Sequence, residues 1–279
     1  MTVTEAITIF RRNQKAILKQ RTHQSYNYLL QRFETHFANR SFESIGSEEI
    51  HQFLELLTER YAKSTRRLRS AQTKALFNLI IENCSLNIKN PCSAAILSKS
   101  FKMPRQTPRT ILDKESVDEM IYNAKSLRDR LILELQARCG LRIGETLRLK
   151  VSDVSDRRLL LKEPKLGKEE EVAFMPEQVA KRLDEYIHKE ALAGADRLFP
   201  ICYSTARSLV KQYGEKLNVN ISPHDLRRHS ATFASRNGVP LEIISKVILR
   251  HQDLKTTQMY LGKVSDAEAI RWMDTLHER

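Results

Sequence analysis

The sequence contains little of what marks secreted, membrane-spanning or low-complexity proteins. Only four of its 279 residues are cysteine, and none of them forms a C-x-x-C pair. Scattered thiols of this kind indicate a reduced cytosolic protein with neither a disulfide framework nor a zinc site. No apolar run approaches the roughly 20 residues that a membrane span needs, and the chain does not open with the pattern of a signal peptide. We therefore expect a folded, cytoplasmic protein that needs no membrane.

Acidic residues are too few to balance the basic ones. The chain has 34 Asp and Glu against 47 Lys and Arg, which gives a net charge of +13. This excess favours nucleic acid or an anionic membrane surface as partner, although ribosomal and merely soluble basic proteins share it. The length favours two domains, each large enough to bury its own core.

The first third of the chain is predicted to be helical. Thr2 and Glu5 have the spacing of a capping box, and Ser47 is a good N-cap for a later helix. Apolar residues at helical spacing predict further helices over about residues 20–38 and 64–80. The polar side of the last helix carries four basic residues: Arg66, Arg67, Arg69 and Lys74. They form either a solvated face or a surface that contacts DNA.

The periodic pattern loosens after about residue 90, where two prolines and several basic residues, Arg105 among them, indicate a linker. We expect domains at residues 1–98 and 111–279, joined by a linker over residues 99–110. The charge of this linker suits a segment that crosses a DNA backbone, but many linkers are basic for other reasons.

The second domain is predicted to combine helices with a small antiparallel sheet. Asp113 caps a first helix, and a second helix leads into Arg142; Glu145 either holds this arginine or faces solvent. Short strand-like runs at residues 158–161 and 171–174, together with residues 151–154, predict the sheet. Later helices are expected over about residues 176–192 and 203–217. The second carries Arg207 and Lys211, which we predict to contact DNA together with Arg105 and the basic residues of the first domain.

Four separated pieces of this domain carry the chemistry. His224 and Arg227 are three residues apart and share one helix face, so both can point at one ligand. His251 and Tyr260 follow, and Arg142 precedes them. Two arginines can clamp the two non-bridging oxygens of a phosphodiester, and a phenol can act as the nucleophile. The residues indicate phosphate chemistry.

This set resembles the tyrosine recombinase family of phage integrases and Xer proteins. The order and spacing agree, as do the surrounding words Gly-Leu-Arg-Ile-x-Glu and His-Asp-Leu-Arg-Arg-His. The resemblance implies a mainly α fold: an N-terminal helical, SAM-like core-binding domain that binds DNA, followed by an α+β catalytic domain. It also implies a site-specific DNA recombinase whose catalytic residues are Arg142, Lys165, His224, Arg227, His251 and Tyr260.

The implied reaction needs no cofactor, ATP or metal. Tyr260 attacks the phosphodiester and forms a 3′-phosphotyrosine link, while a hairpin lysine protonates the leaving 5′-oxygen. Lys165 matches that lysine best, with Lys162 and Lys168 as rivals. The partners implied are double-stranded DNA, three further copies of the chain in a tetramer docked through a C-terminal helix near residues 267–276, and accessory DNA-bending proteins, at a prokaryotic nucleoid.

Two other functions remain as alternatives. A type IB topoisomerase uses a similar pocket but relaxes DNA as a monomer, and a non-catalytic architectural protein would bind DNA without cutting it. The full set of six catalytic residues argues against the second, and the helical N-terminal domain argues against the first. The sequence does not choose among integration, excision, inversion and dimer resolution, although its simple organisation leans toward an Xer-like enzyme.

Overall fold

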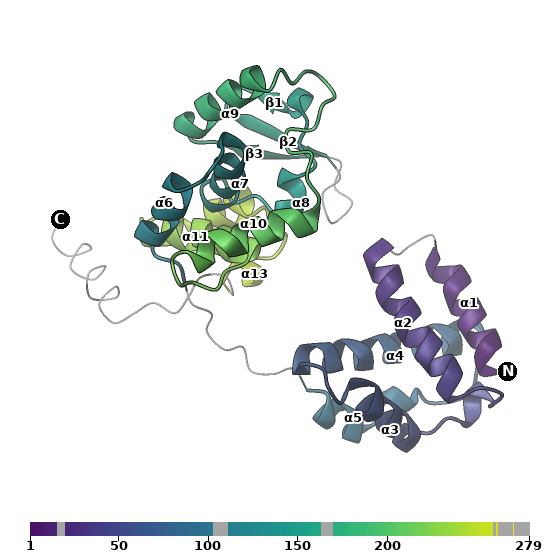
Figure 1. Ribbon diagram of the computed structural model, residues 1–279. Coiled ribbons are helices and arrows are strands. Elements are labelled where there is room, and N and C mark those ends of the chain that lie inside the picture. The colour runs from purple at the N-terminus through teal and green to yellow at the C-terminus, as the bar shows by residue number, and fades with distance from the viewer. Residues whose placement is uncertain (16–19, 103–110, 163–169, 259–260, 262–269, 271–279) are drawn as a thin grey trace. The chain divides into compact units, whose positions relative to one another are not determined.

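The computed structural model describes residues 1–15, 20–102, 111–162 and 170–258, with residues 261 and 270. The chain divides into two compact units, Met1–Thr107 and Pro108–Arg279 (Figure 1). Each unit has its own hydrophobic core. The first unit extends beyond residue 98, because Phe101 is buried in its core.

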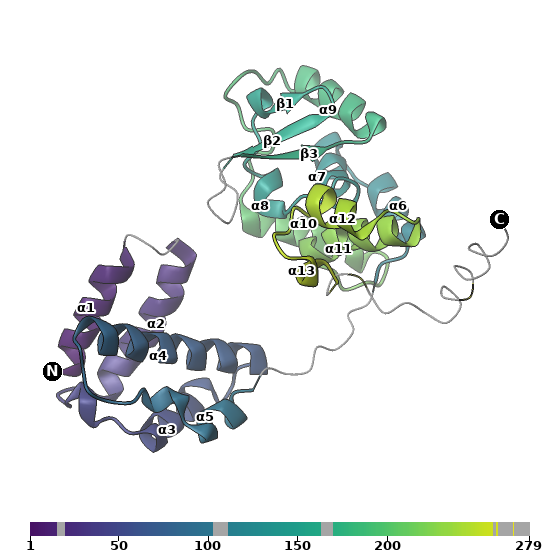
Figure 2. The same ribbon diagram turned by 180° about the vertical axis from the view of Figure 1, so that it is seen from behind.

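The first unit is helical and is built around aromatic packing. Phe33 contacts the rings of Phe37, Phe53 and Phe77 at centroid distances of 4.7 to 6.1 Å. Helices α1 and α2 lie side by side against the long α4, and α3 packs on α4 as well (Figures 1 and 2). The helical elements are α1 (Val3–Lys15), α2 (Gln20–His36), η1 (Phe42–Ser44), α3 (Ser47–Thr58), α4 (Lys63–Asn83), η2 (Pro91–Ser93) and α5 (Ala95–Ser100).

The N-termini of α1 and α3 can be compared with the two predicted helix caps. The capping box at Thr2 and Glu5 is confirmed, since each backbone N–H donates to the other side chain, at 2.7 and 3.2 Å. The prediction of Ser47 as an N-cap is wrong. Gly46 is the N-cap, because the Glu49 carboxylate reaches back to its N–H at 3.0 Å, and Ser47 is already helical.

The second unit combines helices with the predicted three-stranded sheet. The strands β1 (Val154–Ser155), β2 (Arg158–Lys162) and β3 (Glu170–Phe174) pair antiparallel in that order, with Leu161 opposite Glu171. Most of the first expected strand is instead the 3-10 turn η3 (Val151–Asp153). The other elements are α6 (Lys114–Tyr122), α7 (Leu127–Ala137), α8 (Ile143–Thr146), α9 (Glu177–Lys189), α10 (Tyr203–Glu215), α11 (Pro223–Arg236), α12 (Leu241–Ile243), the π-helical η4 (Ile244–Ile248) and α13 (Leu254–Gln258).

Helix α7 organises this unit. It contacts α6, α8, α9, α10 and α11. The sheet and α9 lie at one end of the unit, and α10, α11 and α13 lie at the other (Figures 1 and 2). Because α7 ends just before Gly140, its packing fixes the loop that leads into Arg142. The predicted mainly α fold with a small antiparallel sheet is confirmed.

Candidate active site

Helix α11 carries two of the predicted site residues near its N-terminus. Ser222 is the N-cap, and its backbone N–H donates to the Asp225 carboxylate at 2.9 Å, as part of a capping box. Pro223 occupies the first helical turn. This start places His224 on the exposed side and Arg227 one turn later in the interior. Asp225 is thus a structural partner of the helix start.

Arg227 joins two loops that are far apart in the sequence. Its Nη1 donates to the carbonyl oxygen of Gly140, and its Nη2 donates to the carbonyl oxygen of Leu249. Nη1 also lies 3.7 Å from the Glu145 carboxylate. A buried guanidinium is tolerated only where hydrogen bonds and a counter-charge offset its desolvation. These partners supply both and fix Arg227 beside the loop that leads into Arg142.

Arg142 is the N-cap of α8 and is held by Glu145. Its backbone N–H donates to Oε2 of Glu145 at 2.8 Å, and its Nη1 donates to Oε1. Glu145 is buried, so it holds the arginine and does not face solvent. Burial acts to raise the pKa of Glu145, but the charges of Arg250, Arg142 and Arg227 outweigh it and lower the pKa. The Arg142 side chain stays 29% exposed, so a ligand can reach it.

His251 follows the π-helical turn η4 and is buried. Its backbone N–H donates to the carbonyl oxygen of Ser245 at 2.8 Å. Its Nδ1 lies 2.9 Å from Oγ1 of Thr257, which in turn donates to Oγ of Ser245 at 2.9 Å. Both hydroxyl residues are fully buried. The ring is therefore held through Nδ1.

Burial and nearby positive charges set the pKa of His251. Burial lowers its pKa most, and four cationic groups add to the effect: Arg227, Arg142, Arg250 and His224. Together they bring the pKa of His251 from 6.5 to about 4, so the imidazole is neutral at pH 7. Charge effects weaken with distance. Arg142, Arg227 and Arg250 also share contacts with Glu145, so the structure brings together groups from three separate parts of the chain.

The sequence interpretation assigned no role to Arg250, which belongs to the same cluster. Its side chain is 4% exposed, and its Nη2 donates to Oε2 of Glu145 at 2.8 Å. Its Nε lies 3.7 Å from the carboxylate of Glu171 on β3. The available signal was a charged residue within the otherwise apolar run before His251.

Three of the predicted residues lie outside the part of the chain that the structure describes: Arg105, Lys165 and Tyr260. Helix α13 ends at Gln258, two residues before Tyr260. Lys168 is also outside, but Lys162 is described at the end of β2, where its Nζ donates to the buried carboxylate of Asp153. This ion pair engages the amine of Lys162 within the fold.

The basic residues of α4 divide into two kinds. Arg67 and Lys74 are exposed. The Arg66 guanidinium lies over the ring of Phe101 at 5.3 Å and is half-buried. Arg69 is bound within the fold: its Nη1 donates to the backbone carbonyl of Ser25 at 2.6 Å. This helix therefore presents a smaller basic surface than its sequence indicates.

Helix α10 carries the other two predicted DNA-contacting residues. Arg207 is exposed, and Lys211 forms a surface ion pair with Glu215 at 3.0 Å. An exposed pair of this kind contributes little to stability, so it leaves the lysine available to a phosphate.

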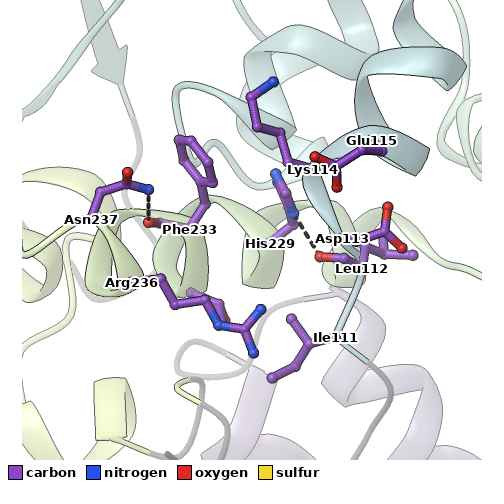
Figure 3. Close-up of a pocket in the computed structure, with 10 residues that line it drawn as sticks. Ile111, Leu112, Asp113, Lys114, Glu115, His229, Phe233, Arg236 and Asn237 are labelled. Carbon is purple, nitrogen blue, oxygen red and sulfur yellow. Dashed lines mark hydrogen bonds between the residues drawn. The ribbon is translucent and has the colours of Figure 1, made fainter. Parts of the chain in front are cut away.

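A separate hollow of about 240 Å³ lies between the start of α6 and α11 (Figure 3). It is lined in part by His229, Phe233 and Arg236, and Nδ1 of His229 lies 2.9 Å from the carbonyl oxygen of Leu112. At 3.6 residues per turn, this side of α11 is opposite to the one that carries Arg227. The hollow is therefore distinct from the catalytic cluster, and His229 is a structural residue.

Two further properties belong to the described part of the chain. Among the described residues, no three His, Cys, Asp or Glu side chains lie close enough together to hold a metal ion. This part of the chain also contains no helix of the length and apolarity that crossing a membrane requires.

Comparison with known proteins agrees with this geometry. The model of the phage integrase family matches residues 110–266, more than half of the chain, and that of the N-terminal SAM-like domain of phage integrases matches residues 8–84. This chain belongs to the phage integrase family. The predicted resemblance to tyrosine recombinases is confirmed, and the integrase-family chain is a site-specific DNA recombinase, an enzyme that breaks and rejoins DNA strands.

Relatives of this integrase-family chain span most of its length. The tyrosine recombinase XerA of Pyrococcus horikoshii is 32% identical over 243 residues, which cover 82% of this chain and 81% of that protein. XerD of Proteus mirabilis is 28% identical over 239 residues, covering 78% and 74%.

Solved structures share the fold of the integrase-family chain. The Tn1549 transposon integrase in complex with transposon right-end DNA superimposes with a TM-score of 0.78, at 18% identity over 99% of both chains. A lambda integrase dimer bound to a core site gives 0.76, at 16% identity over 95% of this chain and 100% of that one.

Proposed function

We propose that this recombinase cuts and rejoins DNA through a covalent 3′-phosphotyrosine intermediate, with Tyr260 as the nucleophile. The observation that supports this most is the cluster around Glu145. It gathers Arg142, Arg227 and His251, and the charges of both arginines act on the histidine. A site with two guanidiniums and a neutral imidazole suits an anionic phosphate in which negative charge builds up.

The reaction transfers one phosphoryl group and conserves its bond energy. The Tyr260 phenol oxygen attacks phosphorus, a bond forms between them, and the bond from phosphorus to the 5′-oxygen breaks. The phenol has a free pKa of about 10, so its proton must leave; the exposed His224 accepts or directs it. Arg142 and Arg227 stabilise the pentacoordinate phosphorane. A 5′-hydroxyl of the partner strand then reverses the step.

His251 would act on the same phosphate through Nε2. Thr257 donates to Ser245, so in neutral His251 it is Nδ1 that carries the proton and donates to Thr257. Nε2 then accepts hydrogen bonds and cannot donate one. A bound phosphodiester adds a negative charge that offsets the arginines, and this raises the pKa of His251. We infer that DNA binding protonates His251 and makes Nε2 a donor to the phosphorane.

We assign the leaving-group proton to Lys165. The ion pair of Lys162 with Asp153 disfavours that rival, because its amine is already engaged in the fold. Lys168 remains as the alternative. No cofactor or metal takes part in this scheme.

DNA contacts are proposed on both units. In the first unit Arg67 and Lys74 are exposed on α4, and Arg66 lies beside them. In the second unit Arg207 and Lys211 lie on α10. Arg105 of the linker would cross the backbone. For Arg69 we now favour a structural role, because its guanidinium holds α4 to α2.

The active assembly is proposed to be a tetramer on two DNA sites, in which half of the protomers cut at a time. Support comes from a lambda integrase structure of related fold, which is a tetramer bound to a Holliday junction. Docking of a C-terminal helix on a neighbouring protomer, accessory DNA-bending proteins and action at the nucleoid are parts of the same proposal.

Covalent trapping tests this function. Nicked suicide substrates, drawn from the DNA that flanks the gene, release a short strand after cleavage and leave the enzyme linked to DNA. We expect wild type to give an SDS-resistant adduct and Tyr260→Phe to give none, while both bind DNA equally. Binding without any adduct would favour the architectural alternative. Relaxation of plasmids that lack a target site would favour the topoisomerase alternative.

A further inference from the structure

Arg250 occupies an unusual backbone position directly before His251. Its φ is +50°, in the left-handed region that residues other than glycine rarely adopt. The side chain is folded into the interior, where Nη1 donates to the carbonyl oxygen of Ile248 at 2.8 Å and Nη2 lies 3.3 Å from that of Gly140. A charged side chain persists at such a position only where its surroundings fix it.

The guanidinium groups of Arg250 and Arg142 bind different carboxylate oxygens of Glu145. Oε2 accepts from Nη2 of Arg250 at 2.8 Å, and Oε1 accepts from Nη1 of Arg142. An arginine and a carboxylate alone tend to pair through two parallel hydrogen bonds. Oε2 also accepts from the backbone N–H of Arg142 at 2.8 Å. Because Arg250 and this N–H occupy Oε2, the Arg142 guanidinium donates to Glu145 from Nη1 alone within the described chain. Its other donors are left for a phosphate.

Arg250 also sets the charge of the cluster. Its Nε has an ion-pair contact with Glu171 of β3 at 3.7 Å. Two carboxylates, Glu145 and Glu171, face three guanidiniums here: Arg142, Arg227 and Arg250. Without Arg250, the negative charges of the two carboxylates would cancel the positive charges of Arg142 and Arg227. The third guanidinium leaves the site with a net positive charge for an anionic substrate.

We propose that Arg250 is a positioning residue of the recombination site. It occupies one oxygen of Glu145 and ties this glutamate to β3, so that Arg142 keeps unused donors and the cluster keeps its positive charge. This role rests on the proposed function, since Arg250 acts through Arg142 and does not itself touch the DNA.

The test compares Arg250→Met on two suicide substrates. One has an ordinary phosphodiester at the cleavage site, and the other has a methylphosphonate, in which an uncharged methyl group replaces one non-bridging oxygen. Less negative charge then needs to be offset by arginine. On the phosphodiester we expect cleavage to fall by about 10-fold or more, as expected for a weakened transition-state donor. On the methylphosphonate, the cleavage rate of Arg250→Met should be only a few-fold below that of wild type.

Two further variants make the comparison specific. Arg142→Ala should likewise have a smaller cleavage defect on the methylphosphonate than on the phosphodiester. Both substitutions weaken the same interaction, that of Arg142 with the phosphate. Arg182→Gln is the matched structural control: it removes a guanidinium from the buried Glu134 in the same unit. It should lower thermal stability and change cleavage of both substrates by the same factor.

The outcomes separate the two claims. An Arg250→Met enzyme that cuts at the wild-type rate, or that is impaired equally on both substrates, overturns the positioning role. If Arg250→Met does not fold, Arg250→Lys takes its place. A lysine cannot contact Glu145 and the carbonyl oxygen of Ile248 at the same time, so its cleavage defect should also be smaller on the methylphosphonate than on the phosphodiester. A wild-type enzyme that forms no adduct on either substrate refutes the proposed function instead.

Discussion

Nδ1 of His251 and Oγ1 of Thr257 lie 2.9 Å apart, and this contact holds the imidazole by one nitrogen. Thr257 is fully buried and donates its own proton to Ser245 at 2.9 Å. The relay orients the imidazole of His251 through Nδ1. A buried hydroxyl next to His251 thus helps to set the state of the site.

Thr257→Val tests this relay. The substitution keeps the shape and removes the hydroxyl, so His251 loses its anchor. A buried hydrogen bond is worth about 1 kcal/mol, and we expect single-turnover cleavage to fall by about 5-fold. Thr257→Ser, which keeps the hydroxyl, should stay near wild type. Equal rates for Val and Ser would show that the relay does not act on catalysis.

His251 also makes stability depend on pH. Its pKa is about 4 in the folded chain, against the ordinary histidine value of 6.5 that applies once the chain unfolds. Between these values the unfolded chain binds a proton that the folded chain does not, so stability is lost as pH falls from 6.5 toward 4. The loss from this group is at most about 3 kcal/mol.

Urea unfolding across this pH range measures the effect. His251→Gln should give a shallower fall in unfolding free energy than wild type. Burial also lowers the pKa of His229, which adds to the slope in both proteins and does not alter their difference. Parallel curves for the two proteins would contradict the assignment.

Arg227→Lys is expected to be far from conservative. Lysine keeps the charge but has no fork to reach the carbonyl oxygens of both Gly140 and Leu249. We expect a loss of about 3 kcal/mol in unfolding free energy and no measurable cleavage. The neighbouring Arg228→Lys, in a half-buried pair with Asp225, serves as control and should retain most activity. Thermal unfolding and suicide-substrate cleavage measure both quantities.

Gly140 is predicted to admit no side chain. Its φ is +64°, and a Cβ there would lie 2.8 Å from the carbonyl oxygen of Ile248. Gly194 has a similar φ of +48° but nothing within 4 Å of an added Cβ. Gly194→Ala should therefore cost only backbone strain of about 1 kcal/mol. Gly140→Ala should cost at least about 2 kcal/mol more from the clash, and equal unfolding temperatures would contradict this.

The sequence predicted much of the site because helix geometry and local caps are short-range. The pairing of His224 with Arg227 follows from helix periodicity, and the capping box at Thr2 follows from residue spacing. The small sheet also followed from its short apolar strand-like runs. These features depend on neighbours within a few residues.

What the sequence did not predict depends on contacts between distant segments. Arg250 contacts Glu145 across 105 positions, and no local pattern marks that pair. Arg69 reads as part of a basic helix face, yet its guanidinium turns toward Ser25 of another helix. The Ser47 cap failed for a local reason, because the Glu49 carboxylate favoured the preceding glycine.

The most direct test of the account is to identify the residue that becomes linked to DNA. Trypsin should cut after Lys255 and Lys263, and the peptide of residues 256–263 contains a single tyrosine, Tyr260. After nuclease digestion of a trapped adduct, mass spectrometry should find this peptide with a nucleotide joined through its 3′-phosphate to Tyr260. A link to another residue, or to a 5′-phosphate, would contradict the proposed chemistry.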